Sequence, residues 1–179
     1  MNSPIVPRID VLFDADAIAA RVDALAQEIV SDMGLRPFLV SILTGSFMFT
    51  ADLLRAAHQA GAMPDMGFMG LSSYGSGQHS SGEVKLTYEL AADVAGRDIL
   101  IVDDILDTGR TLDYARNLLH QRGAASIRSC VLLDKKARRV VAAIPDFVGF
   151  ACPDQFVVGY GLDHDNAFRH LPFIGTLKE

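Results

Sequence analysis

The stretch ILIVDDILDTGRT, from Ile99 to Thr111, decides how the rest of this chain is interpreted. Ile99 to Val102 is a continuous apolar run, which is typical of a strand buried on both faces of a parallel sheet. Apolar residues then recur at helical spacing at Leu112, Ala115, Leu118 and Leu119. Gly123 follows at the position where a helix commonly ends. The stretch therefore predicts a strand, a short turn and a helix.

The turn carries polar groups that suit a sugar phosphate. Asp103 and Asp104 follow the apolar run, and Asp107 precedes the segment Thr108-Gly109-Arg110-Thr111. A helix N-terminus offers unpaired N–H groups and a partial positive charge, so it binds phosphate. Carboxylates can accept hydrogen bonds from sugar hydroxyls or help to hold hydrated Mg²⁺. The alternative is an ordinary buried strand with an acidic turn that caps the next helix.

Length and composition predict one globular domain over residues 1–179, with half of its residues hydrophobic and 21% charged. Cys130 and Cys152 stand in apolar surroundings without metal-ligand spacing, so we expect reduced thiols in a cytoplasmic protein. The net charge of −6 argues against generic nucleic-acid binding. We expect no membrane association, because no apolar run approaches the roughly 20 residues that span a bilayer. No secretory signal is expected either.

Strand and helix patterns alternate along the chain, which predicts an α/β fold. An extended arm over Met1 to Val11 comes first. A helix follows, capped by Asp14 or Asp16 and ending at Gly34. A second helix is expected at about Phe47 to Ala60, and the further strands are Phe38–Leu43, Met66–Leu71, Glu83–Leu90, Ile127–Leu133, Phe147–Phe150 and Phe156–Tyr160.

The segment Ser72 to Gly82 consists of small and polar residues with three glycines, so it cannot pack a core. It lies between two predicted strands. Most segments of this kind are solvated hairpin tips, but loops of this length also serve as lids over a site. Both interpretations stay open at this point.

The run VDDILDTGRT resembles the phosphoribosyl pyrophosphate motif of type I phosphoribosyltransferases, most of all their hypoxanthine-guanine branch. The stretch PDQFVVGYGLD, from Pro153 to Asp163, resembles the purine-binding end of that branch. The resemblance covers nearly the whole chain after the first helix. It implies a parallel sheet of about five strands flanked by helices. It also implies a small hood from the N-terminal arm and about residues 150–179, and a flexible catalytic loop.

The resemblance implies roles for residues around the sugar and its phosphates. Asp103 and Asp104 would hold the ribose hydroxyls directly or through Mg²⁺, and Asp107 would accept or donate a proton at N7 of the base. The residues matched to the 5′-phosphate site are Thr108, Gly109, Arg110 and Thr111. Those matched to the pyrophosphate site are Thr44, Gly45, Ser73, Tyr74 and Arg169. Many relatives carry Lys or Arg at the place of Thr44, and the family can hold a cis peptide at Leu43–Thr44.

At the base, Lys135 would contact the 6-oxo group and Phe156 would stack on the ring. The backbone of Val157 would pair with the edge of the base, and Asp163 would help to hold a Mg²⁺. Arg139 would order the pyrophosphate-loop region. Without the resemblance, Phe156 would be taken for a core residue, and the basic run Lys135 to Arg139 for a solvated turn. We interpret His164 as exposed, because Mg²⁺ prefers oxygen ligands.

The implied function is purine salvage. The enzyme would transfer the 5-phosphoribosyl group from phosphoribosyl pyrophosphate to hypoxanthine or guanine, giving IMP or GMP and pyrophosphate. It would use Mg²⁺ and form a homodimer or homotetramer. One alternative is a regulator that senses ligands with this fold and binds RNA or DNA, which only the basic run favours. Another is an enzyme specific for xanthine or a pyrimidine.

Overall fold

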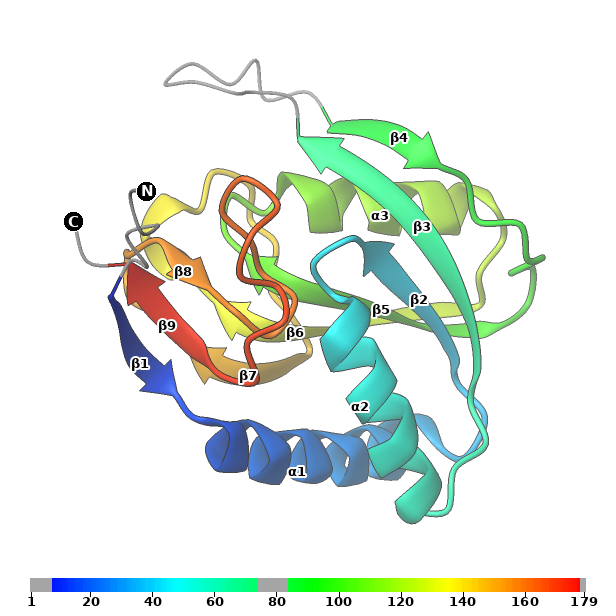
Figure 1. Cartoon of the computed structure of the whole chain (residues 1–179). Helices are drawn as coiled ribbons and strands as arrows, with labels where there is room; N and C mark the ends of the chain where they lie inside the picture. The colour runs from blue at the N-terminus through cyan, green and yellow to red at the C-terminus, as the bar shows by residue number, and fades with distance from the viewer. Residues whose placement is uncertain (1–7, 74–83, 178–179) are drawn as a thin grey trace.

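The computed structural model describes residues 8–73 and 84–177. Its centre is a six-stranded sheet with the order β4-β3-β2-β5-β6-β7 (Figure 1). Pairing is parallel from β3 to β7, whereas β4 adds an antiparallel edge strand to β3. The predicted parallel sheet of about five strands is therefore confirmed. The strands are β2 Phe38–Leu43, β3 Asp65–Ser73, β4 Val84–Tyr88, β5 Asp98–Leu106, β6 Ser126–Asp134 and β7 Phe147–Ala151.

Helices cover both faces of this sheet. The helices α1 (Ala15–Met33) and α2 (Phe47–Gln59) lie on one face, and α3 (Arg110–Gln121) lies on the other (Figure 1). Side chains of β5 alternate between the two cores, because successive residues of a strand point to opposite faces. Leu100 and Val102 pack with α1 and α2, and Ile99 and Ile101 pack with α3. The continuous apolar run of β5 follows from this burial on both sides.

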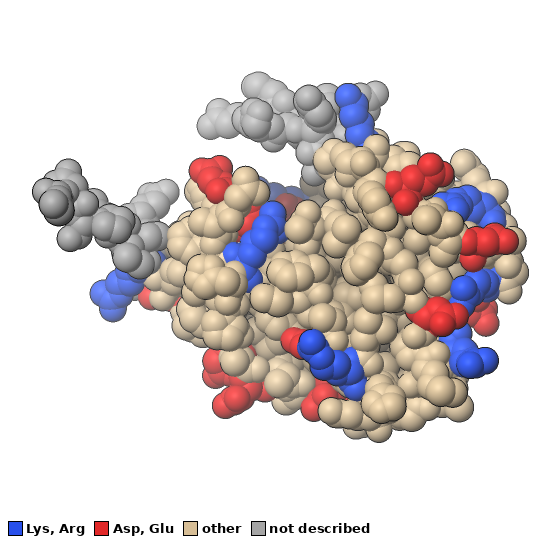
Figure 2. All heavy atoms as spheres, turned by 45° about the vertical axis from the view of Figure 1, so that its right-hand side comes forward, with Lys and Arg blue, Asp and Glu red and all other residues tan. Residues whose placement is uncertain are grey.

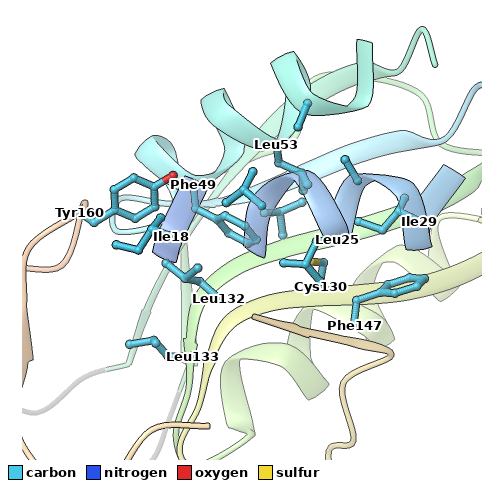
Figure 3. Packing of buried hydrophobic residues seen from close by; sticks show 14 of the residues in the cluster. Ile18, Leu25, Ile29, Phe49, Leu53, Cys130, Leu132, Leu133, Phe147 and Tyr160 are labelled. Carbon is cyan, nitrogen blue, oxygen red and sulfur yellow. The ribbon is translucent and has the colours of Figure 1, made fainter. Parts of the chain in front are cut away.

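The larger core lies between the sheet and the first two helices. Figure 3 shows Ile18, Leu25 and Ile29 of α1 beside Phe49 and Leu53 of α2, with β6 side chains below them. The start of α1 is as predicted, because the Asp14 carboxylate accepts a hydrogen bond from the Ala17 N–H at 2.8 Å. Among the described residues, no helix is both long and apolar enough to cross a membrane.

The two ends of the chain meet in a small antiparallel sheet. Its order is β1-β9-β8, with β1 at Ile9–Phe13, β8 at Val157–Val158 and β9 at Ile174–Leu177 (Figure 1). This is the predicted hood. The predicted strand Phe156–Tyr160 is shorter, because residues 159, 160 and 161 have φ of 99°, 49° and 100°, outside the range of a strand.

The sheet opens at one place along its carboxyl edge. β2 and β5 are neighbours, but they lead into helices on opposite faces, and such a switch point leaves a crevice between the strand ends. β2 pairs with β5 only along Ile99–Val102, whereas Asp103 to Leu106 still pair with β6. The sequence pattern placed Asp103 and Asp104 after the strand, but in the structure both residues belong to β5. They stand where β2 has already turned away.

Candidate active site

A cleft of about 730 Å³ lies at this carboxyl edge. Its walls come from the ends of β2, β3, β5 and β6. Residues 155–169, which include β8, complete them. The predicted site residues that line it are Thr44, Gly45, Asp103, Asp104, Asp107, Thr108, Gly109, Thr111, Lys135, Phe156, Val157, Asp163 and Arg169. The side chain of Arg110 instead lines a separate groove with Asp113 and Tyr114. Ser73 is the last residue of β3, and Tyr74 lies outside the described residues.

Two adjacent carboxyl groups lie at the floor of the cleft. Asp103 is almost wholly buried, and its Oδ1 accepts a hydrogen bond from the Asp104 N–H at 3.1 Å. Burial and the neighbouring Asp104 raise the pKa of the Asp103 carboxyl well above its usual value, and burial also raises the pKa of Asp104. Such a pair favours a ligand that brings positive charge or hydrogen-bond donors.

The loop after β2 packs directly on Asp104. The Leu43–Thr44 peptide bond is cis, at the position that the resemblance implied. A Cβ atom on Gly45 would lie 1.6 Å from Oδ2 of Asp104, so no larger residue fits there. A Cβ atom on Gly161 would lie 2.1 Å from the carbonyl oxygen of Gly45. Three distant segments of the chain therefore meet through glycine backbone at one point.

Buried hydroxyl groups anchor this loop from below. The Thr50 hydroxyl donates to Oγ of Ser41 at 2.9 Å, and Ser41 and Ser46 share a hydrogen bond of 2.8 Å. Ser46 also donates to the carbonyl oxygen of Ile42 at 2.5 Å. All three hydroxyl residues are buried. Their hydrogen bonds tie Ser46, at the end of the loop, and Thr50 of α2 to the strand β2, next to the exposed Thr44 and to Gly45.

The start of α3 forms the opposite wall. Gly109 precedes the helix with φ of 88°, and its position carries no side-chain cap. The Arg110 N–H donates to Oγ1 of Thr108 at 3.4 Å. The next N–H groups have no partner within the helix, so they remain available to an anion. The carbonyl oxygen of Thr108 accepts hydrogen bonds from the N–H groups of Val140 at 2.9 Å and Val141 at 3.0 Å. The turn is therefore held from the side away from the cleft.

Arg139 braces the same turn. Its guanidinium donates to the carbonyl oxygens of Leu106 at 3.2 Å, Asp107 at 2.9 Å and Ala143, and to the Asp134 carboxylate at 2.5 Å. Asp134 ends β6, so this arginine ties the end of β6 to the connection between β5 and α3. None of these hydrogen bonds reaches the loop after β2, so the expected role of Arg139 in ordering the pyrophosphate-loop region stays a prediction. Arg139 comes five residues after the end of β6 at Asp134, and its side chain lies beside the connection between β5 and α3.

Asp107 lies within this braced turn. Its Oδ1 atom is buried and has no hydrogen-bond partner among residues 8–73 and 84–177. A buried acceptor without a partner is costly, and a ligand that donates a hydrogen bond removes that cost. Asp107 lines the cleft, so a molecule bound there is a candidate donor for this carboxyl group.

The last wall combines a buried cation with an exposed aromatic ring. The Lys135 side chain is only 6% exposed, and its Nζ donates to the carbonyl oxygen of Gln155 at 3.1 Å. Phe156 is 59% exposed, which is unusual for a residue that would otherwise belong in a core. Its ring meets the edge of His164, which is exposed as expected. Val157 follows within β8 and is buried.

Asp163 and Arg169 form an ion pair at the rim, with 2.7 Å between Oδ1 and Nη2. Arg169 also donates to the carbonyl oxygen of Gly161 at 2.7 Å, so it holds the glycine that rests on Gly45. In the described part of the chain, no group of three or more Asp, Glu, His or Cys side chains could hold a metal ion unaided. A cation here would need oxygen atoms from a ligand as well.

A family model for the phosphoribosyl transferase domain matches residues 9–165. The chain belongs to the phosphoribosyl transferase family. The hypoxanthine phosphoribosyltransferase of Escherichia coli (strain K12) is 43% identical over 172 residues, which cover 94% of this chain and 95% of that protein. The bifunctional protein TilS/HprT of Listeria innocua is 45% identical, and the matched region is 94% of this chain but only 26% of that protein.

Solved structures agree with this phosphoribosyl transferase assignment. A hypoxanthine phosphoribosyltransferase from Staphylococcus aureus has a TM-score of 0.87 at 39% identity, covering 94% of this chain and 91% of that one. A Trypanosoma cruzi hypoxanthine phosphoribosyl transferase has a TM-score of 0.89 at 39% identity, covering 99% and 95%.

Sequence reasoning missed two residues of this site. Gly161 lies inside the stretch that resembles the purine-binding end, and its glycine character was the available signal. Asp154, which contacts Lys135 at 3.2 Å, carries no signal in the sequence, because only the fold brings these two side chains together.

Gly45→Ala should disable the site without unfolding the protein. The added methyl group overlaps Asp104 and must displace either the carboxylate or the loop, and misplacement of about 1 Å can cost about 100-fold in rate. The measurements are the rate of phosphoribosyl transfer and the thermal unfolding midpoint. Gly61→Ala is the control, because Gly61 has open space around it and should cost only about 1 kcal/mol of stability. Activity near wild type in Gly45→Ala would contradict the close packing.

Proposed function

We propose that this chain transfers the 5-phosphoribosyl group from phosphoribosyl pyrophosphate to N9 of hypoxanthine or guanine. The products are IMP or GMP and pyrophosphate, and the reaction serves purine salvage. One observation carries the proposal: a single cleft joins a helix N-terminus to an exposed aromatic ring beside a buried ammonium group. The first suits a phosphate and the second suits an oxopurine. The names of the relatives support the same substrates.

The sugar phosphate binds between two walls of the cleft. Backbone N–H groups at Thr108 to Thr111, with the two threonine hydroxyls, hold the 5′-phosphate. We assign the contribution of Arg110 to its main chain, because its side chain faces the other groove. Asp103 and Asp104 accept from the ribose hydroxyls. Thr44 and Gly45 offer main-chain donors to the pyrophosphate, and Arg169 offers a guanidinium.

Ser73 and Tyr74, which the resemblance assigns to pyrophosphate, remain predictions from the sequence.

Asp107 handles the proton of the base. The proposed orientation places N7 of the purine near its unpartnered Oδ1 atom, so the carboxyl group can accept or donate a proton there. The brace from Arg139 keeps the main chain of Asp107 in place, with 2.9 Å between Nε and the carbonyl oxygen. The turn before α3 therefore carries the proposed proton-transfer group, Asp107, and is held in place by Arg139.

The site residues fit Mg²⁺. The carboxylate oxygens of Asp103, Asp104 and Asp163 line the cleft. Burial and the neighbouring Asp104 raise the pKa of Asp103, and a bound cation would offset both effects. Asp103 and Asp104 would hold one ion and Asp163 another. Mg²⁺ commonly takes one or two carboxylates and completes its shell with water and substrate phosphates. When bound, Mg²⁺ would supply the positive charge that neutralises the pyrophosphate group.

The base binds against Phe156, with its 6-oxo group toward Lys135. An ammonium group only donates hydrogen bonds, so it pairs with the oxygen of hypoxanthine or guanine. The amino group of adenine at that position is chiefly a donor and meets another donor. The backbone around Val157 pairs with the remaining edge of the base.

A regulator that binds RNA or DNA finds less support. The basic run from Lys135 to Arg139 does not form a basic surface. Lys135 is buried, and the Arg139 guanidinium donates hydrogen bonds to main-chain carbonyl groups within the protein. Arg138 pairs with Asp154 at 2.8 Å. Figure 2 shows basic and acidic side chains interspersed on the face in view.

We also propose a homodimer or homotetramer that works in the cytoplasm. The two cysteines are free and buried, which suits a reducing compartment. For the Trypanosoma cruzi relative, the C-terminal region has a described role in the oligomeric state and in enzymatic activity.

A panel of bases tests the function. Hypoxanthine, guanine, xanthine, adenine and uracil are each incubated with phosphoribosyl pyrophosphate and Mg²⁺, and nucleotide formation is followed. Rapid formation of IMP and GMP is expected. If nucleotide forms only with uracil, or only with xanthine, the proposal is wrong.

Asp107→Asn should lower kcat by about 10²–10⁴-fold, the usual contribution of a general acid or base. The substitution keeps the shape and the bracing of the turn, so the KM for phosphoribosyl pyrophosphate should stay near the wild-type value. Steady-state kinetics with hypoxanthine measure both quantities. A variant with near-normal kcat would remove Asp107 from the mechanism.

Lys135→Ala should weaken the use of both oxopurines and narrow their advantage over adenine. A site built around such a hydrogen bond discriminates by about 10⁴–10⁵. The measurement is kcat/KM for hypoxanthine and adenine in both proteins. If the wild type uses adenine as well as hypoxanthine, the role of Lys135 and the choice of substrates are both wrong.

A further inference from the structure

The carboxylate of Asp154 links two cations at the base end of the cleft. Its Oδ1 lies 3.2 Å from Nζ of Lys135 and 2.8 Å from Nε of Arg138. The Lys135 side chain is almost buried, whereas the Asp154 side chain is 44% exposed. Asp154 is therefore the carboxylate that accompanies the buried ammonium group.

The local backbone fixes this arrangement. Lys135 follows β6, and its N–H donates to the carbonyl oxygen of Leu106 at 3.0 Å. The chain after β7 runs alongside, because the Cys152 N–H donates to the carbonyl oxygen of Asp134 at 2.9 Å. A tight turn follows, in which the Gln155 N–H donates to the carbonyl oxygen of Pro153 at 2.8 Å. This turn, stiffened by a proline, directs Asp154 and the carbonyl group of Gln155 toward Lys135.

The donors of Lys135 can be counted. An ammonium group has three N–H bonds. One is directed to the carbonyl oxygen of Gln155 at 3.1 Å and a second to Asp154. The third has no partner in the described part of the chain, and Lys135 lines the cleft beside Phe156 and Val157. Because Gln155 and Asp154 engage the ammonium group from the protein side, its remaining N–H is available to an acceptor in the cleft.

We propose that Asp154 is a positioning residue that sets the choice of base. Together with the carbonyl group of Gln155, it holds the Lys135 ammonium so that the remaining N–H meets the oxygen at position 6 of a purine. The inference rests on the proposed function and deepens it.

The charge of Asp154 supports this role. The hydrogen bond from Lys135, together with Arg138, lowers the pKa of the Asp154 carboxyl, so it is ionised at neutral pH. A buried ammonium group is stable only when it is paired. Without Asp154, the flexible lysine side chain can turn its N–H groups toward other acceptors, including the ring nitrogen N1 of adenine. The penalty against adenine then falls.

Asp154→Ala and Asp154→Asn test the inference, with Asp165→Asn as the matched control. Asp165 lies in the same segment and is 97% exposed, and its ion pair is with His164 at 3.6 Å. The readouts are kcat/KM for hypoxanthine and for adenine, the KM for phosphoribosyl pyrophosphate, and the unfolding midpoint.

In Asp154→Ala, the ratio of kcat/KM for hypoxanthine to that for adenine should fall by about 10-fold or more, as expected for a lost charge-assisted hydrogen bond. The KM for phosphoribosyl pyrophosphate should not change. Asp154→Asn should give a smaller fall, because its amide oxygen still accepts from Lys135. Asp165→Asn should keep the wild-type ratio.

An unchanged ratio, or an equal loss with both bases, would assign Asp154 a merely structural role and overturn the inference. If Asp154→Ala does not fold, Asp154→Asn decides by the same ratio. A wild-type protein that uses neither oxopurine would refute the proposed function and this inference together. A wild type that rejects adenine strongly, with variants that reject it equally, would refute this inference alone.

Discussion

The contact between Gly45 and Asp104 is the constraint on which the site depends. There is no room for even one carbon atom between the loop after β2 and the carboxylate of β5, since a Cβ atom would lie 1.6 Å from Oδ2. Gly161 closes on the other side of the same loop. The loop proposed to bind pyrophosphate therefore touches the strand that carries Asp103 and Asp104, and it also touches the segment that follows Phe156. A shift in any of these three moves the other two.

The sheet makes this contact possible. β2 and β5 lie side by side, yet α2 and α3 cover opposite faces, so the chain leaves the sheet in two directions from one place. β5 continues along β6 after β2 has turned away, which exposes one edge of Asp103 and Asp104 to the cleft. The braces behind the walls are polar: Ser41, Ser46 and Thr50 on one side, and Arg139 on the other.

Most of the fold could be predicted because its signals are local. The apolar run at Ile99–Val102, the helical spacing after Thr111 and the cap at Asp14 each depend on a few neighbouring residues. The true end of β5 could not be predicted, because it depends on pairing with β6 alone. The bonds of Arg139 and the contact between Asp154 and Lys135 join segments that only the folded chain brings together. The spacing of residues along the sequence does not predict contacts between such distant segments.

A crystal structure of this chain with bound IMP tests the central claim most directly, since the nucleotide reaches from the phosphate wall to the base wall. The account predicts the phosphate on the main-chain N–H groups at the start of α3. It predicts the ribose hydroxyls at Asp103 and Asp104, and the base on Phe156 with its 6-oxo oxygen within hydrogen-bond distance of Nζ of Lys135. A phosphate bound away from Thr108 to Thr111, or a base turned away from Lys135, would contradict it.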